Sequence, residues 1–157
     1  MVILRTTLVA TVLIICVAHA TNAQPSTTYL YSHDGRSTGT LRRSDNTTTE
    51  YDAAGRVTGT LRSYGSTTTQ FDRTGRVEGA ARSSGNTTWF TDAQGRSSGR
   101  SVTSGDTVTH YDADGRVRGT SRRTRDTTYY YDESGRSAGS ARGDVESDFW
   151  PVPAENR

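Results

Sequence analysis

The chain is poor in the residues that usually stabilise small domains. Of its 157 residues one is cysteine and three are proline, and 31% are hydrophobic, compared with about 45–50% apolar residues in ordinary globular domains. The single cysteine, Cys16, excludes an internal disulfide and a cysteine-based zinc site. The fold must therefore be stabilised by packing and hydrogen bonds among few apolar side chains.

Lysine is absent, yet the charges are balanced. All 19 basic residues are arginine, they are matched by 17 Asp and Glu, and acid and base alternate along the chain. A nucleic-acid-binding domain would carry an uncompensated basic face, so we expect no nucleic-acid partner. The scattered histidines and carboxylates lack the spacing of a metal site, and we expect no metal and no cofactor.

The first residues are typical of a secretory signal peptide. One positive charge precedes an apolar stretch over residues 8–18, and residues 18–20 (AHA) form a small-x-small cleavage site. The apolar stretch is too short to span a bilayer as a helix. We expect cleavage after Ala20 or Ala23, which removes residues 1–23 and leaves a secreted or periplasmic protein without a membrane span. An uncleaved anchor is the alternative.

Residues 24–142 repeat one unit of about twenty residues in tandem. The clearest copies are YDAAGRVTGTLRSYGSTTTQ at 51–70 and its successors at 71–90, 91–110 and 111–130, with looser copies at 31–50 and 131–150. A fixed period of this length indicates a repeat architecture, in which each unit packs on its neighbours. The strict period also argues against disorder, which the low apolar content would otherwise favour.

Each unit predicts a β-hairpin. Residues 47–52 are β-branched or aromatic, residues 53–55 form a three-residue loop that ends in glycine, and residues 56–62 return as a second strand. The loop glycine, which needs a left-handed conformation, recurs as Gly35, Gly55, Gly75, Gly95, Gly115 and Gly135. In the next connection either Gly65 or Ser66 takes the left-handed position, and both options predict a loop of odd length.

The three-residue loop predicts the register of the hairpin. Tyr51 lies opposite Val57, and uninterrupted pairing continues to Thr49 opposite Gly59. Because directly opposed residues share a face, Tyr51, Val57 and Leu61 are expected on one weakly apolar face. We expect this face to turn inward as the sheet curls.

Two columns of the repeat have structural interpretations. The mid-strand glycines are Gly39, Gly59, Gly79, Gly99, Gly119 and Gly139, and the aromatic column is Tyr31, Tyr51, Phe71, Tyr111 and Tyr131. We expect the aromatic rings to lie over the bare glycine backbone, which an aromatic can stabilise in a strand. The recurring Asp/Arg pairs, such as Asp52 with Arg56, are expected to fix the register.

The predicted fold is all-β: an antiparallel meander of about twelve strands in tandem 20-residue hairpins, forming one curled, solenoid-like or partly closed sheet. A flat single layer, with its apolar face exposed or buried against another molecule, is the alternative. Residues 143–157 are predicted to cap the sheet, with Phe149 and Trp150 covering the apolar face. A peptide that docks on a partner is the second interpretation of this tail.

The segment Gly65–Arg76, GSTTTQFDRTGR, resembles the YD repeat of the RHS proteins, and the resemblance covers residues 27–142. It implies hairpins in a spiralling sheet and a secreted or surface-exposed bacterial protein, in a family sometimes linked with carbohydrate binding. Six units are too few to form the hollow shell of large members, so we expect the fold to carry over and toxin delivery not to.

Four aromatic residues interrupt the threonine-rich first strands and are the candidate ligand-binding residues: Trp89, Phe90, Tyr129 and Tyr130. Their expected partner is a carbohydrate or a protein of the cell envelope. The G-x-S-x-G sequence at 35–39 is made by two repeat glycines, and no catalytic set of nucleophile, base and oxyanion donors accompanies it. We therefore expect a non-enzymatic binding protein. The alternatives are a structural component that self-assembles through sheet edges and a fragment-like relative of the RHS toxin-delivery proteins.

Overall fold

The chain folds into a closed barrel of twelve antiparallel strands. The computed structural model describes residues 25–143, so the predicted signal peptide and the predicted cap from residue 144 onward lie outside the described residues. The first strands of the six hairpins are β1 (Ser26–Ser32), β3 (Thr47–Asp52), β5 (Thr67–Asp72), β7 (Thr87–Asp92), β9 (Thr107–Asp112) and β11 (Thr127–Asp132). The second strands are β2 (Ser37–Ser44), β4 (Val57–Tyr64), β6 (Val77–Ser84), β8 (Ser97–Ser104), β10 (Val117–Thr124) and β12 (Ser137–Arg142).

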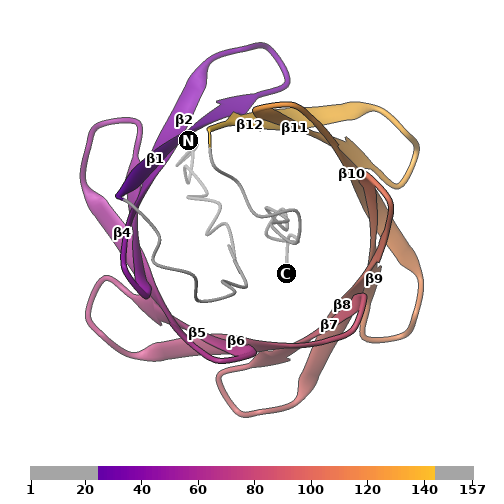
Figure 1. Cartoon of the computed structure of the whole chain (residues 1–157), viewed down its shortest axis with the longest axis horizontal. Coiled ribbons are helices and arrows are strands. Elements are labelled where there is room, and N and C mark those ends of the chain that lie inside the picture. Colours follow the sequence, from indigo (N-terminus) through magenta and orange to yellow (C-terminus); the bar gives the residue numbers. More distant parts are fainter. Residues whose placement is uncertain (1–24, 144–157) are drawn as a thin grey trace, which may run out of the picture.

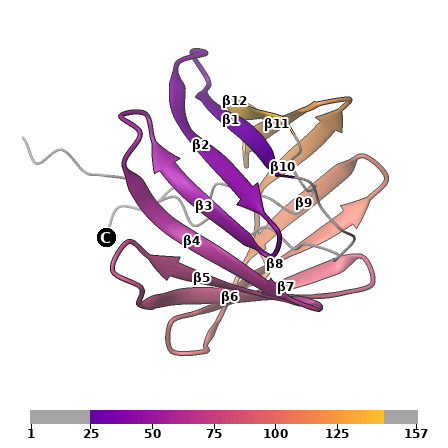
Figure 2. The ribbon, with the colours of Figure 1, turned by 60° about the vertical axis from the view of Figure 1, so that its left-hand side comes forward.

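The strands follow the chain order around the barrel, as Figure 1 shows. The ring closes where β1 pairs with β12, with Tyr29 opposite Arg142 and Leu30 opposite Ala141. The strands run obliquely across the barrel wall (Figure 2), as closure of a sheet requires. The predicted all-β meander of hairpin repeats is confirmed, and the sheet is closed.

The three-residue loop forms as predicted. The Asp52 amide donates to the Arg56 carbonyl (2.9 Å), the Gly55 amide donates to the Asp52 carbonyl (3.0 Å), and Gly55 has a φ of 76°. The Asp52 carboxylate also accepts hydrogen bonds from the backbone amides of Ala54 and Arg56, both at 2.9 Å. The repeated aspartate therefore stabilises the turn through backbone amides within its own loop.

The predicted register is wrong beyond the first pairs of the hairpin. Tyr51 does lie opposite Val57, but the next pair is Glu50 with Gly59, so Thr58 is an extra residue in β4. This β-bulge recurs in every hairpin. Since successive side chains of a strand alternate between faces, a shift of one residue moves every following side chain to the other face.

The second connection is shorter than predicted. Only Gly65 and Ser66 lie between β4 and β5, so the expected odd-length loop is wrong. Gly65 holds the left-handed position with a φ of 57°, as in two-residue hairpin loops that place glycine first. Two units have another residue at this position: Asp45 (φ 52°) and Arg125 (φ 56°).

The bulge divides the predicted apolar face, and only Leu61 lies inside as expected. Leu61 is buried inside the barrel together with Glu50, whereas Tyr51 and Val57 lie on the outside. The expected packing of aromatic rings over the mid-strand glycines is therefore also wrong. At Gly99 an added Cβ would lie 2.3 Å from the backbone oxygen of Tyr111, so the glycine is required by the close approach of two strands.

The barrel interior is unusually polar. Its buried apolar residues are Leu41, Leu61, Ala81, Val108, Tyr130 and Ala141. Its buried polar residues are Thr28, Glu50, Ser63, Thr68, Gln70, Thr88, Ser101, His110, Ser121 and Thr128. Buried polar groups need hydrogen-bond partners. Any buried polar side chain without a partner is therefore a candidate for a functional role.

Candidate functional site

The structure divides the four predicted ligand-binding residues between two faces. Trp89 and Tyr129 lie on the outer face, where they are 46% and 45% exposed. Phe90 and Tyr130 follow them in the chain and point inward, because neighbouring residues of a strand alternate. The four residues therefore cannot form one site, and the outer and inner faces are separate candidates.

Arginines lie beside both outer aromatic residues. Trp89 is directly opposite Arg82 of β6 and Arg100 of β8. Tyr129 is directly opposite Arg122 of β10. A large exposed ring with guanidinium groups on the neighbouring strands combines a flat apolar surface with several hydrogen-bond donors.

A third exposed aromatic residue, Tyr29, completes this set. It is 49% exposed and lies directly opposite Arg142 across the β1–β12 seam. Tyr29 occupies the same repeat position as Trp89 and Tyr129, so the period could have identified it from sequence. We call Tyr29, Trp89 and Tyr129 the outer aromatic residues.

The aromatic column of the repeat is also on the outside, where arginines cover three of its five rings. The contacts are Arg42 Cζ 5.0 Å from the centre of the Tyr51 ring, Arg62 Cζ 5.3 Å from that of Phe71, and Arg100 Cζ 4.7 Å from that of Tyr111. These distances are within the range of cation–π interactions. These three rings therefore pack against arginines on the outer face, and not over the mid-strand glycines as predicted.

Two of the exposed salt bridges lower the pKa values of aspartates at strand ends or in loops. Arg96 Nε lies 2.8 Å from Asp92 Oδ2, and a backbone hydrogen bond from Arg96, together with this side-chain contact, lowers the pKa of Asp92. Arg142 Nε lies 3.1 Å from Asp126 Oδ2, and this contact lowers the pKa of Asp126. These aspartates therefore remain ionised at neutral pH.

Inside the barrel, both ring nitrogens of His110 lie within hydrogen-bond distance of serine hydroxyls. Its Nδ1 lies 2.7 Å from Ser101 Oγ and its Nε2 lies 3.1 Å from Ser121 Oγ. Burial lowers the pKa of His110 to about 3, so the imidazole is neutral at physiological pH. Because both ring nitrogens are satisfied by serines, His110 is explained as part of the structure.

Glu50 and Gln70 differ from His110 in their surroundings. They are 4% and 1% exposed, and Glu50 Oε1 and both polar atoms of the Gln70 amide have no hydrogen-bond partner. Burial, with a smaller effect of the Glu78 charge, raises the pKa of Glu50 to about 8. The sequence pattern identified neither residue as a candidate, because the predicted register without a bulge placed Glu50 on the outer face.

Residues 25–143 contain no helix long and apolar enough to cross a membrane. Within the same residues, no three His, Cys, Asp or Glu side chains are grouped so that they could hold a metal ion.

Comparisons with known proteins inform the fold only. No family model and no curated protein sequence matches the chain. The chain is similar to an X-ray structure of a protein from Arabidopsis thaliana, with a TM-score of 0.50 and 10% sequence identity over 79% of this chain and 81% of that one. At this identity the likeness concerns the fold alone.

Proposed function

We propose that the chain is a secreted or periplasmic, non-enzymatic repeat protein that binds a carbohydrate of the cell envelope on the outside of its barrel. The observation that carries this proposal is the set of outer aromatic residues, each of which lies directly opposite an arginine. An aromatic ring can stack on the apolar face of a sugar, and an arginine can bind a carboxylate through two parallel hydrogen bonds. Acidic sugars are therefore the favoured ligands.

The setting of this function is part of the same proposal. Residues 1–23 have the pattern of a signal peptide, and residues 27–142 resemble the YD repeat of the RHS proteins. Both features support a bacterial protein exported to the envelope, where acidic polysaccharides would be available as ligands. A protein of the envelope is the other partner that a surface of exposed rings and arginines could recognise.

Glycan-array binding of the processed protein tests the proposal. We expect acidic glycans to bind, and Trp89→Ala, Tyr129→Ala or Tyr29→Ala to weaken binding by about tenfold, which corresponds to the loss of about 1.4 kcal/mol. Tyr64→Ala is the matched control, because Tyr64 is 78% exposed but lies opposite Thr67. Arrays without binding, or three variants that bind like the wild type, would contradict the proposal.

Self-assembly through sheet edges receives less support. A strand edge recruits another chain through its unpaired backbone groups, whereas β1 and β12, the first and last of the described strands, pair with each other. We therefore expect the processed protein to sediment as a monomer in analytical ultracentrifugation.

A further inference from the structure

Outward residues that lie directly opposite one another form rows across the strands of the barrel. We define the Trp89 row as six such residues, one from each of the consecutive strands β4 to β9. Its directly opposed pairs are Tyr64 with Thr67, Thr67 with Arg82, Arg82 with Trp89, Trp89 with Arg100, and Arg100 with Tyr111. An exposed indole ring is therefore flanked by one arginine on each of the two neighbouring strands.

The corresponding rows of the other two outer aromatic residues hold a single arginine next to the ring. The directly opposed neighbours are Arg122 and Ser140 for Tyr129, and Arg142 and Thr40 for Tyr29. Arg100 takes the position that serine or threonine holds in those two rows. Of the three outer aromatic residues in the described chain, Trp89 alone thus has an arginine on both sides.

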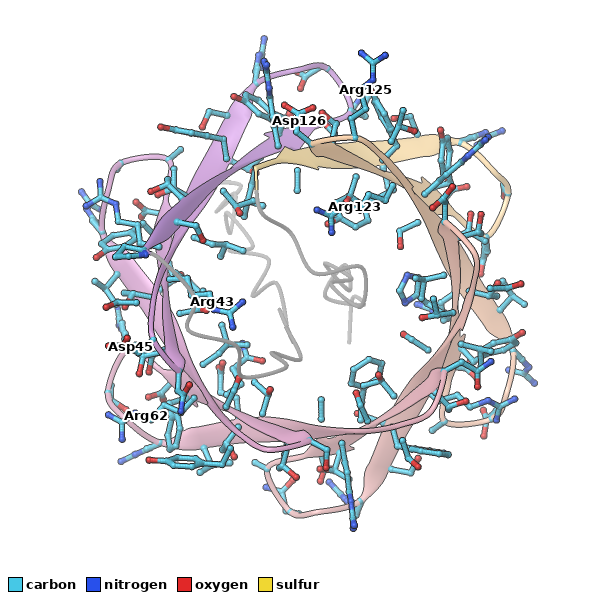
Figure 3. The ribbon with its side chains drawn as sticks, viewed as in Figure 1. Arg43, Asp45, Arg62, Arg123, Arg125 and Asp126 are labelled. Carbon is cyan, nitrogen blue, oxygen red and sulfur yellow. The ribbon has the colours of Figure 1, made fainter. Side chains whose placement is uncertain are left out.

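Arg100 is displaced from a column of arginines that recurs on the outer face. The column consists of Arg42, Arg62, Arg82, Arg122 and Arg142, and the fourth repeat has Val102 at this position. Arg62 points away from the barrel, whereas Arg43 and Arg123, which directly follow column residues in the chain, point into it (Figure 3). A displacement by two residues keeps Arg100 on the outer face and places it directly opposite Trp89.

The charges of the Trp89 row are available to a ligand. Arg82 and Arg100 are both exposed, and within residues 25–143 neither of them forms a salt bridge with a carboxylate. By contrast, Arg142 beside Tyr29 contacts Asp126 at 3.1 Å. The Trp89 row itself contains no Asp or Glu, so a ligand with a negative charge on each side of a stacking group complements it.

The spacing of the two arginines favours two separate carboxylates. Arg82 and Arg100 lie two strands apart, and neighbouring strands are about 4.8 Å apart, so their backbones are separated by about 10 Å. The Cζ of Arg100 lies 4.7 Å from the centre of the Tyr111 ring, and this cation–π contact restrains the guanidinium while its N–H groups can still donate to a carboxylate. Each arginine is therefore expected to bind a carboxylate of its own.

We propose that the Trp89 row binds an acidic polysaccharide in which acidic and neutral sugars alternate, an inference that rests on the function proposed above. The neutral sugar stacks on Trp89, and the carboxylates of the two sugars beside it bind Arg82 and Arg100 through paired hydrogen bonds. The rows of Tyr129 and Tyr29, with one arginine next to the ring, bind a single acidic sugar. The Trp89 row is thus where the protein distinguishes the charge pattern of a glycan.

Tryptophan fluorescence tests this row by itself. The second tryptophan, Trp150, lies outside the described residues, and Trp150→Phe leaves Trp89 as the only source of the signal. In this parent variant we expect a hyaluronan oligosaccharide, which alternates acidic and neutral sugars, to change the Trp89 emission in a saturable manner. It should bind about tenfold more tightly than glucuronic acid or a neutral chitin oligosaccharide of the same length.

Arginine substitutions in the same parent test the role of the second arginine. Arg100→Thr, which introduces the residue found at Thr40, and Arg82→Thr should each weaken hyaluronan binding by about tenfold. Arg62→Thr is the matched control, because Arg62 contacts the Phe71 ring (5.3 Å) but lies opposite a threonine. It should leave the affinity unchanged, and circular dichroism checks that each variant folds.

Several results would overturn the proposal. These are a Trp89 emission that does not respond to the hyaluronan oligosaccharide, or an Arg100→Thr variant that binds it as tightly as the parent. Tighter binding of an oligogalacturonate, which has a carboxylate on every sugar, or of single-stranded DNA would also overturn it. If acidic glycans bind on the array and lose affinity in Tyr129→Ala while Trp89 does not respond, this inference fails and the outer-face proposal stands. An array without acidic glycan binding refutes both.

Discussion

Two side chains of the barrel interior, Glu50 and His110, have strongly shifted pKa values, and we expect both shifts to appear in the pH dependence of stability. Burial raises the pKa of Glu50 from 4.5 to about 8 and lowers the pKa of His110 from 6.5 to about 3. Both shifts favour the neutral form of a side chain removed from water. The folded protein therefore keeps both groups neutral over a pH range in which the unfolded chain would charge one or both of them.

The two groups act in opposite directions. Between pH 4.5 and about 8 the folded state holds one more proton than the unfolded state at Glu50, so stability falls as pH rises. Between about pH 3 and 6.5 the unfolded state holds one more proton at His110, so stability falls as pH falls. Each slope is about 1.4 kcal/mol per pH unit.

Together the two contributions predict that stability is constant over a middle pH range and falls on both the acid and the alkaline side of it. From pH 4.5 to 6.5 the two slopes cancel. Above this range only Glu50 acts, and stability falls by about 2 kcal/mol on reaching pH 8. Below it His110 removes about 2 kcal/mol by pH 3, and exposed aspartates with lowered pKa values, such as Asp92, act in the same direction. The alkaline flank is therefore the cleaner of the two.

Urea unfolding followed by circular dichroism from pH 3 to pH 9 measures these flanks. Glu50→Gln should abolish the alkaline flank and extend the acid flank up to about pH 6.5, because nothing then cancels the His110 slope. His110→Gln should reduce the acid flank and extend the alkaline flank down to about pH 4.5, because nothing then cancels the Glu50 slope. Stability that stays constant between pH 6.5 and 8 in the wild type would refute the reasoning. So would an alkaline flank that persists in Glu50→Gln.

Two further predictions concern the backbone. Gly99→Ala should destabilise the barrel by about 2–3 kcal/mol, because the added Cβ would lie 2.3 Å from the backbone oxygen of Tyr111 and the φ of Gly99 is 146°. Thermal unfolding measures this loss, with Ser97→Ala as the control. Equal melting temperatures of the two variants would contradict the prediction. Arg125→Gly should stabilise by about 1 kcal/mol, because the left-handed conformation with a φ of 56° is costly for a residue with a side chain. A lower urea midpoint for Arg125→Gly than for the wild type would show that the arginine contributes more than its strain costs.

The repeats made the local structure predictable. The type of fold, the six hairpins and the left-handed glycine of the three-residue loop depend on contacts between residues a few positions apart, such as the Asp52 amide with the Arg56 carbonyl. Such contacts are determined by residue type and spacing. The period also placed Trp89 and Tyr129 at equivalent positions, and both lie exposed on the same outer face.

The faces of the strands and the closure of the sheet required the folded barrel. Thr58 becomes an extra residue of β4, and this one-residue shift places Leu61 on the same inner face as Glu50, whereas Val57 shares the outer face with Tyr51. Closure depends on the tilt accumulated over all twelve strands, which finally brings Tyr29 beside Arg142. No local pattern contains these relations, because they arise between strands whose backbones approach only after the whole sheet has curved.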